Sequence, residues 1–266
     1  MLFHCGITMI VCIKLGGSII TQKSKFKTPN PETIDSLCSL IAEYYKKGTQ
    51  FIVVHGAGSY AHIPSKEYGL ADGIKTDEGK VHYAHVHSLC EELSTLVVNS
   101  LIKHGVPAIS FHPATFVIQK NKEPLKIDDA LLFRYFKEGF VPVTHGDVVL
   151  DNSLRTSIIS GDALMEHFGR KVADKLIFAS DVDGLLTSTD GKGEVIPVVT
   201  KRNFKSVYSL VSGSQHTDVT GGMAGKIKNL ISLKCPSYIV NGMHPNRIQS
   251  ILDGREDKYT IILPES

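Results

Sequence analysis

Two lysines beside glycine-rich turns are the residues of this chain best suited to chemistry on phosphate groups. Lys14 is followed by Leu15, Gly16, Gly17 and Ser18 at the end of an apolar run, and Lys226 closes the segment D-V-T-G-G-M-A-G-K at 218–226. Glycines let the backbone come close to a ligand, and successive N–H groups in such turns bind anions. Lysine ammonium groups add the positive charge that phosphate oxygens need. These two segments therefore predict phosphate binding.

A further glycine turn follows the apolar run Phe51–His55. Gly56, Gly58 and Ala61 satisfy the dinucleotide-binding fingerprint G-x-G-x-x-G/A. That fold needs a second strand about twenty residues later, ending in an acidic residue. The segment 67–77 is instead polar and interrupted by glycines. The turn thus predicts a phosphate site without a dinucleotide. A classical P-loop is also excluded at 221–227, because its first glycine is missing and Ile227 replaces the hydroxyl residue.

Two more turns carry aspartates, S-G-D at 160–162 and S-D-V-D-G at 180–184. Loops at the carboxyl ends of parallel strands meet in one crevice. Phosphoryl transfer needs mainly positioning and positive charge around the moving group. The turns together predict transfer between two phosphorylated ligands, although Asp181 and Asp183 taken alone could simply brace their loops.

Apolar runs alternate with helical patterns along almost the whole chain. Several runs are apolar on both faces, which is typical of parallel strands covered by helices on both sides. We therefore predict an α/β fold, a three-layer α/β/α sandwich with a mainly parallel central sheet, formed as a single domain over residues 1–266. The predicted strands are Met9–Lys14, Gln50–His55, Val106–Phe111, Val141–Thr144, Lys175–Ala179 and Ser237–Asn241. The predicted helices are Pro31–Lys47, Gly79–His104, Asp128–Lys137, Asp162–Ala173, Gly222–Leu233 and Pro245–Leu252.

Composition excludes several classes of protein. The 266 residues carry a net charge of only +2, with scattered lysines, which argues against nucleic-acid binding. No apolar run is long enough for a membrane span, and the N-terminus lacks a signal-peptide pattern. Five cysteines without a C-x-x-C pair favour a reducing, cytoplasmic environment. His82, His85 and His87 resemble a metal cluster, but His87 does not share a helix face with the other two, and we predict no metal site in the chain.

The blocks of the chain, in this order, resemble those of the amino-acid kinase superfamily, and within it the isopentenyl phosphate kinases. The matching blocks are K-L-G-G-S-I-I-T-Q-K at 14–23, H-G-A-G-S-Y-A-H at 55–62, G-F-V-P-V-T-H-G-D-V-V-L at 139–150, S-G-D at 160–162, S-D-V-D-G at 180–184 and D-V-T-G-G-M-A-G-K at 218–226. The histidine that ends the second block distinguishes this family from relatives that phosphorylate carboxylates or carbamate. Ala61 and Ser180 depart from the family's glycine and threonine.

The resemblance implies a role for each matching residue. Lys14, Lys23 and Lys226 would stabilise the transferred group, and Asp162 would orient the lysines, with His62 completing the catalytic set. ATP would contact Lys14, Leu15, Gly16, Gly17, Ser18, Ala57, Asp181, Gly222 and Lys226. The acceptor phosphate would contact Gly56, Ala57, Gly58, His62 and Gly161. An acceptor-binding lobe would span about 9–170 and a nucleotide-binding lobe about 171–266.

The implied reaction is ATP-dependent phosphorylation of isopentenyl phosphate to isopentenyl diphosphate in isoprenoid biosynthesis. Mg²⁺ is expected to arrive with ATP, and the resemblance suggests a cytoplasmic homodimer. Two alternatives stay open: a kinase of the same fold for another phosphate or a fosfomycin-like phosphonate, and a non-catalytic binder of nucleotides or oxyanions. Retention of Lys14, Lys23, Asp162 and Lys226 argues against a simple binder, which does not need the full transfer set.

Overall fold

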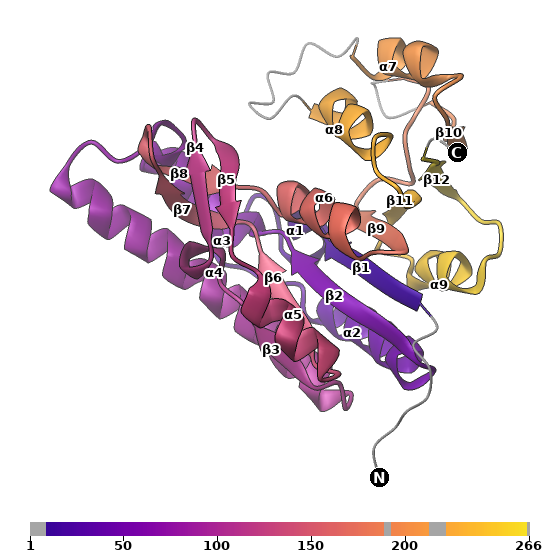
Figure 1. Cartoon of the computed structure of the whole chain (residues 1–266), viewed down its shortest axis with the longest axis horizontal. Coiled ribbons are helices and arrows are strands. Elements are labelled where there is room, and N and C mark those ends of the chain that lie inside the picture. The colour runs from indigo at the N-terminus through magenta and orange to yellow at the C-terminus, as the bar shows by residue number, and fades with distance from the viewer. Residues whose placement is uncertain (1–8, 189–192, 213–221, 265–266) are drawn as a thin grey trace.

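A mainly parallel sheet forms the centre of the computed structural model, which describes residues 9–188, 193–212 and 222–264. Within these ranges its eight strands lie in the order β10-β12-β11-β9-β1-β2-β6-β3 (Figure 1). Their bounds are β1 (Met9–Leu15), β2 (Thr49–His55), β3 (Ala108–Ser110), β6 (Val141–His145), β9 (Lys175–Ser180), β10 (Val198–Val199), β11 (Ser237–Asn241) and β12 (Tyr259–Ile262). Neighbouring strands run parallel, except β11 and β12. The lysine-bearing strand β1 is therefore central, with a partner on each side.

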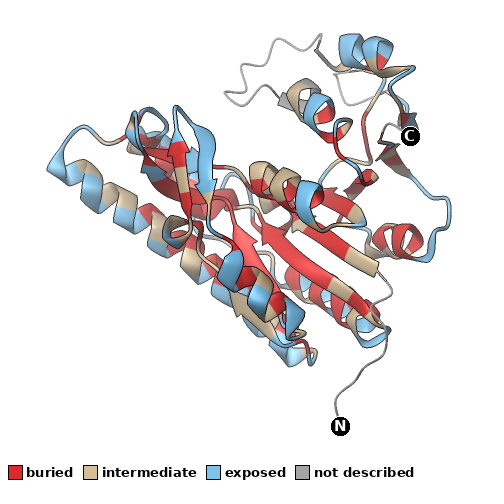
Figure 2. Ribbon diagram, viewed as in Figure 1, coloured by how far each residue is buried: buried red, intermediate tan, exposed pale blue. Residues whose placement is uncertain are grey.

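Helices cover both faces of this sheet because successive side chains of its strands point to opposite sides. On β1, Val11 and Ile13 belong to one apolar core and Cys12 to the other. The first core includes residues of α2 (Pro31–Lys46), α4 (Asp77–Lys103) and α9 (Pro245–Asp253). The second includes residues of α5 (Ala130–Lys137), α6 (Gly161–Lys171) and α8 (Gly222–Leu230). Figure 2 shows the strands buried between these layers. The predicted three-layer architecture is confirmed.

A second, smaller sheet was not predicted. Its order is β5-β4-β7-β8, and its strands are β4 (Val117–Lys120), β5 (Glu123–Ile127), β7 (Asp147–Asp151) and β8 (Arg155–Ile159). It lies beside the N-terminal half of α4 (Figure 1). The pairs β4–β5 and β7–β8 are antiparallel hairpins. The block at 139–150 thus bends from β6 in the main sheet into β7 in the small one.

The predicted elements of the main sheet recur with small shifts at their ends. The strand expected at Val106–Phe111 is shortened to Ala108–Ser110, because the Val106 N–H closes the end of α4 on the Leu101 carbonyl and Pro107 has no N–H. Short helices between strands were missed: α1 (Gly17–Ile20), α3 (Gly58–Glu67), η1 (Leu70–Asp72), η2 (Pro113–Thr115) and α7 (Phe204–Ser212). Residues 67–77 contain no strand, which agrees with the exclusion of a dinucleotide-binding fold.

Cys12, Cys38, Cys90 and Cys235 are buried free thiols; Cys5 lies outside the described residues. Among the helices in the described ranges, none combines the length and apolar character required to cross a bilayer.

Candidate active site

Two lysine side chains, Lys14 and Lys226, contact the same carboxylate, that of Asp162. Lys14 Nζ lies 2.8 Å from Asp162 Oδ1, and Lys226 Nζ lies 3.1 Å from the same oxygen. Lys14 comes from β1, Asp162 from the first turn of α6 and Lys226 from α8. Both lysine side chains are 17% exposed, so water screens their charges only partly. The arrangement holds two ammonium groups side by side at the carboxyl end of β1.

The electrostatics of this cluster follow from burial and mutual attraction. Burial alone would raise the pKa of Asp162, but Lys226 and Lys14 lower it well below its usual range, so the group is a carboxylate. Burial lowers the pKa of Lys226 to about 8, against the pull of Asp162. The Lys226 ammonium also lies 4.1 Å from the centroid of the Phe178 ring, a favourable cation–π distance. Asp162 therefore keeps two neighbouring cations in place.

The first two glycine turns are packed directly against each other. A Cβ on Gly17 would lie 2.4 Å from the Gly58 nitrogen, and a Cβ on Gly56 would lie 2.4 Å from the Gly17 nitrogen. The Gly56 N–H donates to the Leu15 carbonyl at 2.8 Å, and the Gly16 N–H donates to the Ala179 carbonyl at 2.8 Å. Side chains are thus excluded by backbone contact between turns at the ends of β1 and β2. This contact explains why both turns need glycine.

Thr21 joins the two turns and was missed by the sequence reasoning. Its buried hydroxyl donates to the Gly17 carbonyl at 2.7 Å and accepts the Ser59 N–H at 2.9 Å. Thr21 lies within the block at 14–23, but nothing in the residue type separates a bridging hydroxyl from an exposed one. Its role is visible only once the turns are placed.

The turn after β9 meets the loop after β1. Asp181 accepts a hydrogen bond from Ser18 Oγ at 3.0 Å and pairs with Lys23 Nζ at 2.6 Å. Asp183 instead pairs with Arg247 and Lys258, both at 2.6 Å, and braces its loop. The sequence left both roles open, and the structure separates them: Asp181 faces the predicted nucleotide residues and Asp183 does not contact them.

The third turn begins α6, as predicted, with the Ser160 hydroxyl capping the Ala163 N–H at 3.1 Å. It follows β8 of the small sheet rather than a strand of the main sheet. A Cβ on Gly161 would lie 3.2 Å from Lys14 Cε and 3.6 Å from the His55 carbonyl. Gly161 thus lies beside both the lysine and the second glycine turn.

His62 lies on the second turn of α3 and is exposed, beside an open depression that Ile63, Lys66 and Glu67 also line. Ala61 keeps an ordinary helical backbone with φ below zero, so the departure from glycine leaves His62 on a regular helix. An apolar cluster adjoins this turn on its inner side. Its buried members are Ala57, Ala61, Leu70, Val86, Cys90 and Val148, with Tyr68, Ile74 and Tyr83 packed against them. The second glycine turn therefore borders an apolar wall built by α4 and β7.

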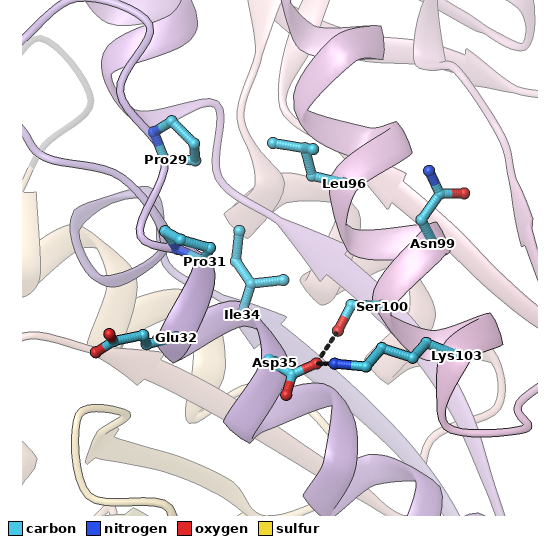
Figure 3. A pocket seen from close by; sticks show the side chains of 9 residues that line it. All are labelled: Pro29, Pro31, Glu32, Ile34, Asp35, Leu96, Asn99, Ser100 and Lys103. Carbon is cyan, nitrogen blue, oxygen red and sulfur yellow. Dashed lines mark hydrogen bonds and ion pairs between the residues drawn. The ribbon is translucent and has the colours of Figure 1, made fainter.

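The remaining residues singled out in the sequence lie on α8 and α4. Gly222 is the first residue of α8, and residues 218–221 of its block fall outside the described ranges. His82 stacks on Tyr68 with ring centroids 3.9 Å apart, whereas His87 contacts Asp147, so the three histidines of α4 form no common group. A groove of about 500 Å³ between α2 and α4 contains none of the predicted site residues; in it Asp35 bonds Ser100 and Lys103 and ties the two helices together (Figure 3).

Comparison with known proteins agrees with this geometry. The model of the amino acid kinase family matches residues 9–241. The isopentenyl phosphate kinase of Methanothermobacter thermautotrophicus is 33% identical over 95% of this chain and 98% of its own length. That of Methanocaldococcus jannaschii is 31% identical over 97% of this chain and 100% of its own. A crystal structure of an isopentenyl phosphate kinase superimposes with a TM-score of 0.81 and 29% identity, covering 95% of this chain and 99% of the other. With its paired glycine turns and its two lysines on one aspartate, the chain belongs to the amino acid kinase family, among the isopentenyl phosphate kinases.

Proposed function

We propose that this protein transfers the γ-phosphoryl group of ATP to isopentenyl phosphate, giving isopentenyl diphosphate and ADP. The observation that carries the proposal is the position of Lys14, Lys226 and Asp162 next to two glycine turns that touch. A phosphate oxygen of the acceptor attacks the γ-phosphorus, and the bond from that phosphorus to the bridging oxygen of ADP breaks. The two ammonium groups offset the charge on the moving group, which is the main demand of this chemistry.

The site divides into donor and acceptor residues. The turn Gly16–Ser18, Asp181 and the start of α8 at Gly222 would hold ATP on the side of Lys226. The turn Gly56–Gly58 with Gly161 would hold the acceptor phosphate, and His62 would donate a hydrogen bond to it. This assignment is supported by the contact between the two turns, because reacting phosphates must be adjacent. It also implies the acceptor-binding and nucleotide-binding lobes at about 9–170 and 171–266, which share the main sheet.

The apolar wall supports a hydrocarbon tail on the acceptor. Tyr68, Ile74 and Tyr83 are half-buried, so part of their surface can contact a ligand, and they pack against the same cluster as Ala57 of the phosphate turn. The Tyr83 hydroxyl donates to the Val148 carbonyl at 3.1 Å, so its polar end is satisfied. A short apolar tail next to such a wall loses contact with water, which is favourable by about 25 cal/mol per Å². A polar acceptor gains nothing there.

Mg²⁺ fits the donor side through ATP rather than through the protein. Asp162 is paired with two lysines, and Asp181 is paired with Lys23 and Ser18. Mg²⁺ usually binds substrate phosphates and keeps several waters. We expect the ion to coordinate ATP oxygens, where it adds positive charge to that supplied by the lysines.

We further infer a cytoplasmic homodimer acting in isoprenoid biosynthesis, by the mevalonate route. Val81, Leu96 and Ile102 are exposed apolar residues along one side of α4, which supports an interface there. Sedimentation equilibrium tests the dimer, and a monomer at micromolar concentration would contradict it.

An assay of ADP release across several acceptors tests the function. Isopentenyl phosphate, dimethylallyl phosphate, geranyl phosphate and fosfomycin should be compared at equal concentrations with ATP and Mg²⁺. We expect the highest kcat/KM with isopentenyl phosphate. Preference for fosfomycin would move the assignment to a phosphonate kinase, and no turnover with any acceptor would favour a non-catalytic binder.

We expect His62→Ala to raise the KM for isopentenyl phosphate by about 10–100-fold, the effect of losing one hydrogen bond to a charged group. Its kcat should change less than its KM. His244→Ala is the matched control, because His244 is also exposed but lies at the start of α9. Unchanged acceptor kinetics in His62→Ala would show that the acceptor phosphate binds elsewhere.

The lowered pKa of Lys226, about 8 as a result of burial, predicts an alkaline limit to the reaction. Below that pH the side chain is a cation, and above it the site loses one positive charge. We therefore expect kcat/KM for ATP to fall above about pH 8, approaching tenfold per pH unit. Lys226→Arg keeps its charge through this range, so its remaining activity should not show this decline. An identical alkaline limb in Lys226→Arg would assign the titration to another group.

A further inference from the structure

A second cluster of chemically capable side chains lies beside the apolar wall and shares Cys90 with it. Cys90 of α4, His145 at the end of β6 and Asp147 at the start of β7 each offer one ligand atom, and these atoms lie within 4.8 Å of one another. Cys90 and His145 are fully buried and Asp147 is 2% exposed. The phosphoryl-transfer site uses none of the three. In the described part of the chain, no other set of His, Cys, Asp and Glu side chains meets this spacing.

The neighbouring contacts prepare His145 as a ligand. A carbonyl oxygen can only accept, so the contact of His145 Nδ1 with the Gly146 carbonyl at 3.1 Å places the proton on Nδ1. Nε2 then carries a lone pair, and His112 Nδ1 lies 3.0 Å from it. Metal-bound histidines usually donate their other ring nitrogen in this way.

His112 lies next to His145 and can supply a fourth ligand by leaving the hydrogen bond that its Nδ1 makes with His145 Nε2. Zn²⁺ binds sulfur at about 2.3 Å and nitrogen or oxygen at about 2.0–2.2 Å in a tetrahedron, which puts ligand atoms about 3.3–3.6 Å apart. The 3.0 Å between the nitrogens of His112 and His145 is close to that spacing. Thiolate and imidazole ligands suit zinc-like ions better than Mg²⁺ or Ca²⁺.

Glu91 and two partly exposed histidines connect this cluster to the protein surface. Glu91 is 43% exposed, and its Oε1 lies 3.4 Å from His87 Nε2 and 3.7 Å from His112 Nε2. His87 Nδ1 lies 2.9 Å from Asp147 Oδ2 and would orient that carboxylate. The two carboxylates attract a cation, and His87 and His112 lie between Glu91 and the buried cluster.

We propose that Cys90, His145 and Asp147 bind one zinc-like divalent transition-metal ion, and that His112 turns toward the ion as the fourth ligand. Binding moves the thiol proton of Cys90 to solvent, and the thiolate becomes the sulfur ligand. The ion would join α4 to the turn between β6 and β7, next to Val148 of the apolar wall. This site is separate from the Mg²⁺ expected with ATP and does not depend on the proposed reaction.

Titration of the intact, EDTA-treated and dialysed protein with Co²⁺, without nucleotide, tests the site. We expect one Co²⁺ per chain, a thiolate-to-cobalt charge-transfer band in the near ultraviolet, and loss of that band when Zn²⁺ is added. Cys90→Ser should lack the band, whereas Cys38→Ser, which alters a buried cysteine of α2 in another core, should keep it. Surface histidines alone give no thiolate band.

Absence of the band from the unmodified protein, or its persistence in Cys90→Ser, would overturn the proposal. If Cys90→Ser fails to fold, His112→Asn decides, because His112 is 26% exposed and its replacement disturbs the core less. Affinity for Co²⁺ lowered at least tenfold in His112→Asn would support the site. Unchanged affinity in that variant would refute it.

Discussion

Replacing Lys226 with alanine is expected to lower kcat by about 10²–10³-fold, the usual effect of removing one group that stabilises transition-state charge. Lys14→Ala should have a similar effect. In either variant Asp162 keeps its other lysine, so the fold retains a paired carboxylate. The KM for isopentenyl phosphate should change by less than about threefold, because the lysines act on the transferred group. Steady-state kinetics with each substrate varied in turn measure both quantities.

Lys171→Ala is the matched control for these lysines. Lys171 Nζ also pairs with an aspartate at 2.7 Å, but that partner, Asp129, is next to α5 and contacts none of the transfer residues. Its loss should leave kcat unchanged. Wild-type kcat in both Lys14→Ala and Lys226→Ala would refute the mechanism.

Adding a single methyl group to Gly17 or Gly56 is expected to lower kcat/KM by at least about 10²-fold. Each new Cβ would lie 2.4 Å from a backbone nitrogen of the opposing turn, so the turns must separate. Displacement of about 1 Å between reacting groups can cost about this factor in rate. Overpacking of this kind also lowers the free energy of unfolding by about 1–3 kcal/mol. Kinetics and urea denaturation of Gly17→Ala and Gly56→Ala measure the two effects.

Gly139→Ala is the control that separates the effect of forcing the two turns apart from the effect of backbone strain alone. Gly139 has φ of +88° and no atom near its missing Cβ, so alanine strains the backbone without forcing segments apart. It should lose about 1 kcal/mol of stability and keep its kinetics. If Gly17→Ala instead behaved like Gly139→Ala, the contact between the turns would have no part in catalysis.

The sequence predicted six of the eight strands of the main sheet, because the runs that form β1, β2, β6, β9 and β11 are largely buried and apolar. The short β10 and the half-buried β12 were not predicted. The small sheet gave no such signal. Four of the five residues of β5 are exposed, and β7 begins and ends with aspartates. Aspartates such as the buried Asp147 and Asp151 usually indicate loops in a sequence. Their partners here include His87 for Asp147 and Asn121 for Asp151, which are distant in the chain. Local sequence patterns therefore predicted the layers of the sandwich but not the β4–β5 and β7–β8 hairpins beside it.

At the site, residue type indicated the lysines and glycines because few other residues can perform their roles. Thr21 and Phe178 were missed because a bridging hydroxyl and a ring beneath an ammonium group depend on tertiary contacts. The same is true of Cys90, His112 and His145, which lie on different segments and meet only after folding. The sequence grouped His87 with His82 and His85 of the same helix, whereas its partner in the structure is Asp147 of β7.

The single hydroxyl of Thr21 has a consequence for the entropy of the reaction. Two phosphates in solution must lose translational and rotational freedom before they can react, and alignment accounts for a large part of an enzyme's advantage. By fixing the Gly17 carbonyl and the Ser59 N–H to one oxygen, Thr21 sets the separation of the two glycine turns that we propose hold donor and acceptor. Much of the ordering that the reaction requires is therefore complete before either substrate arrives.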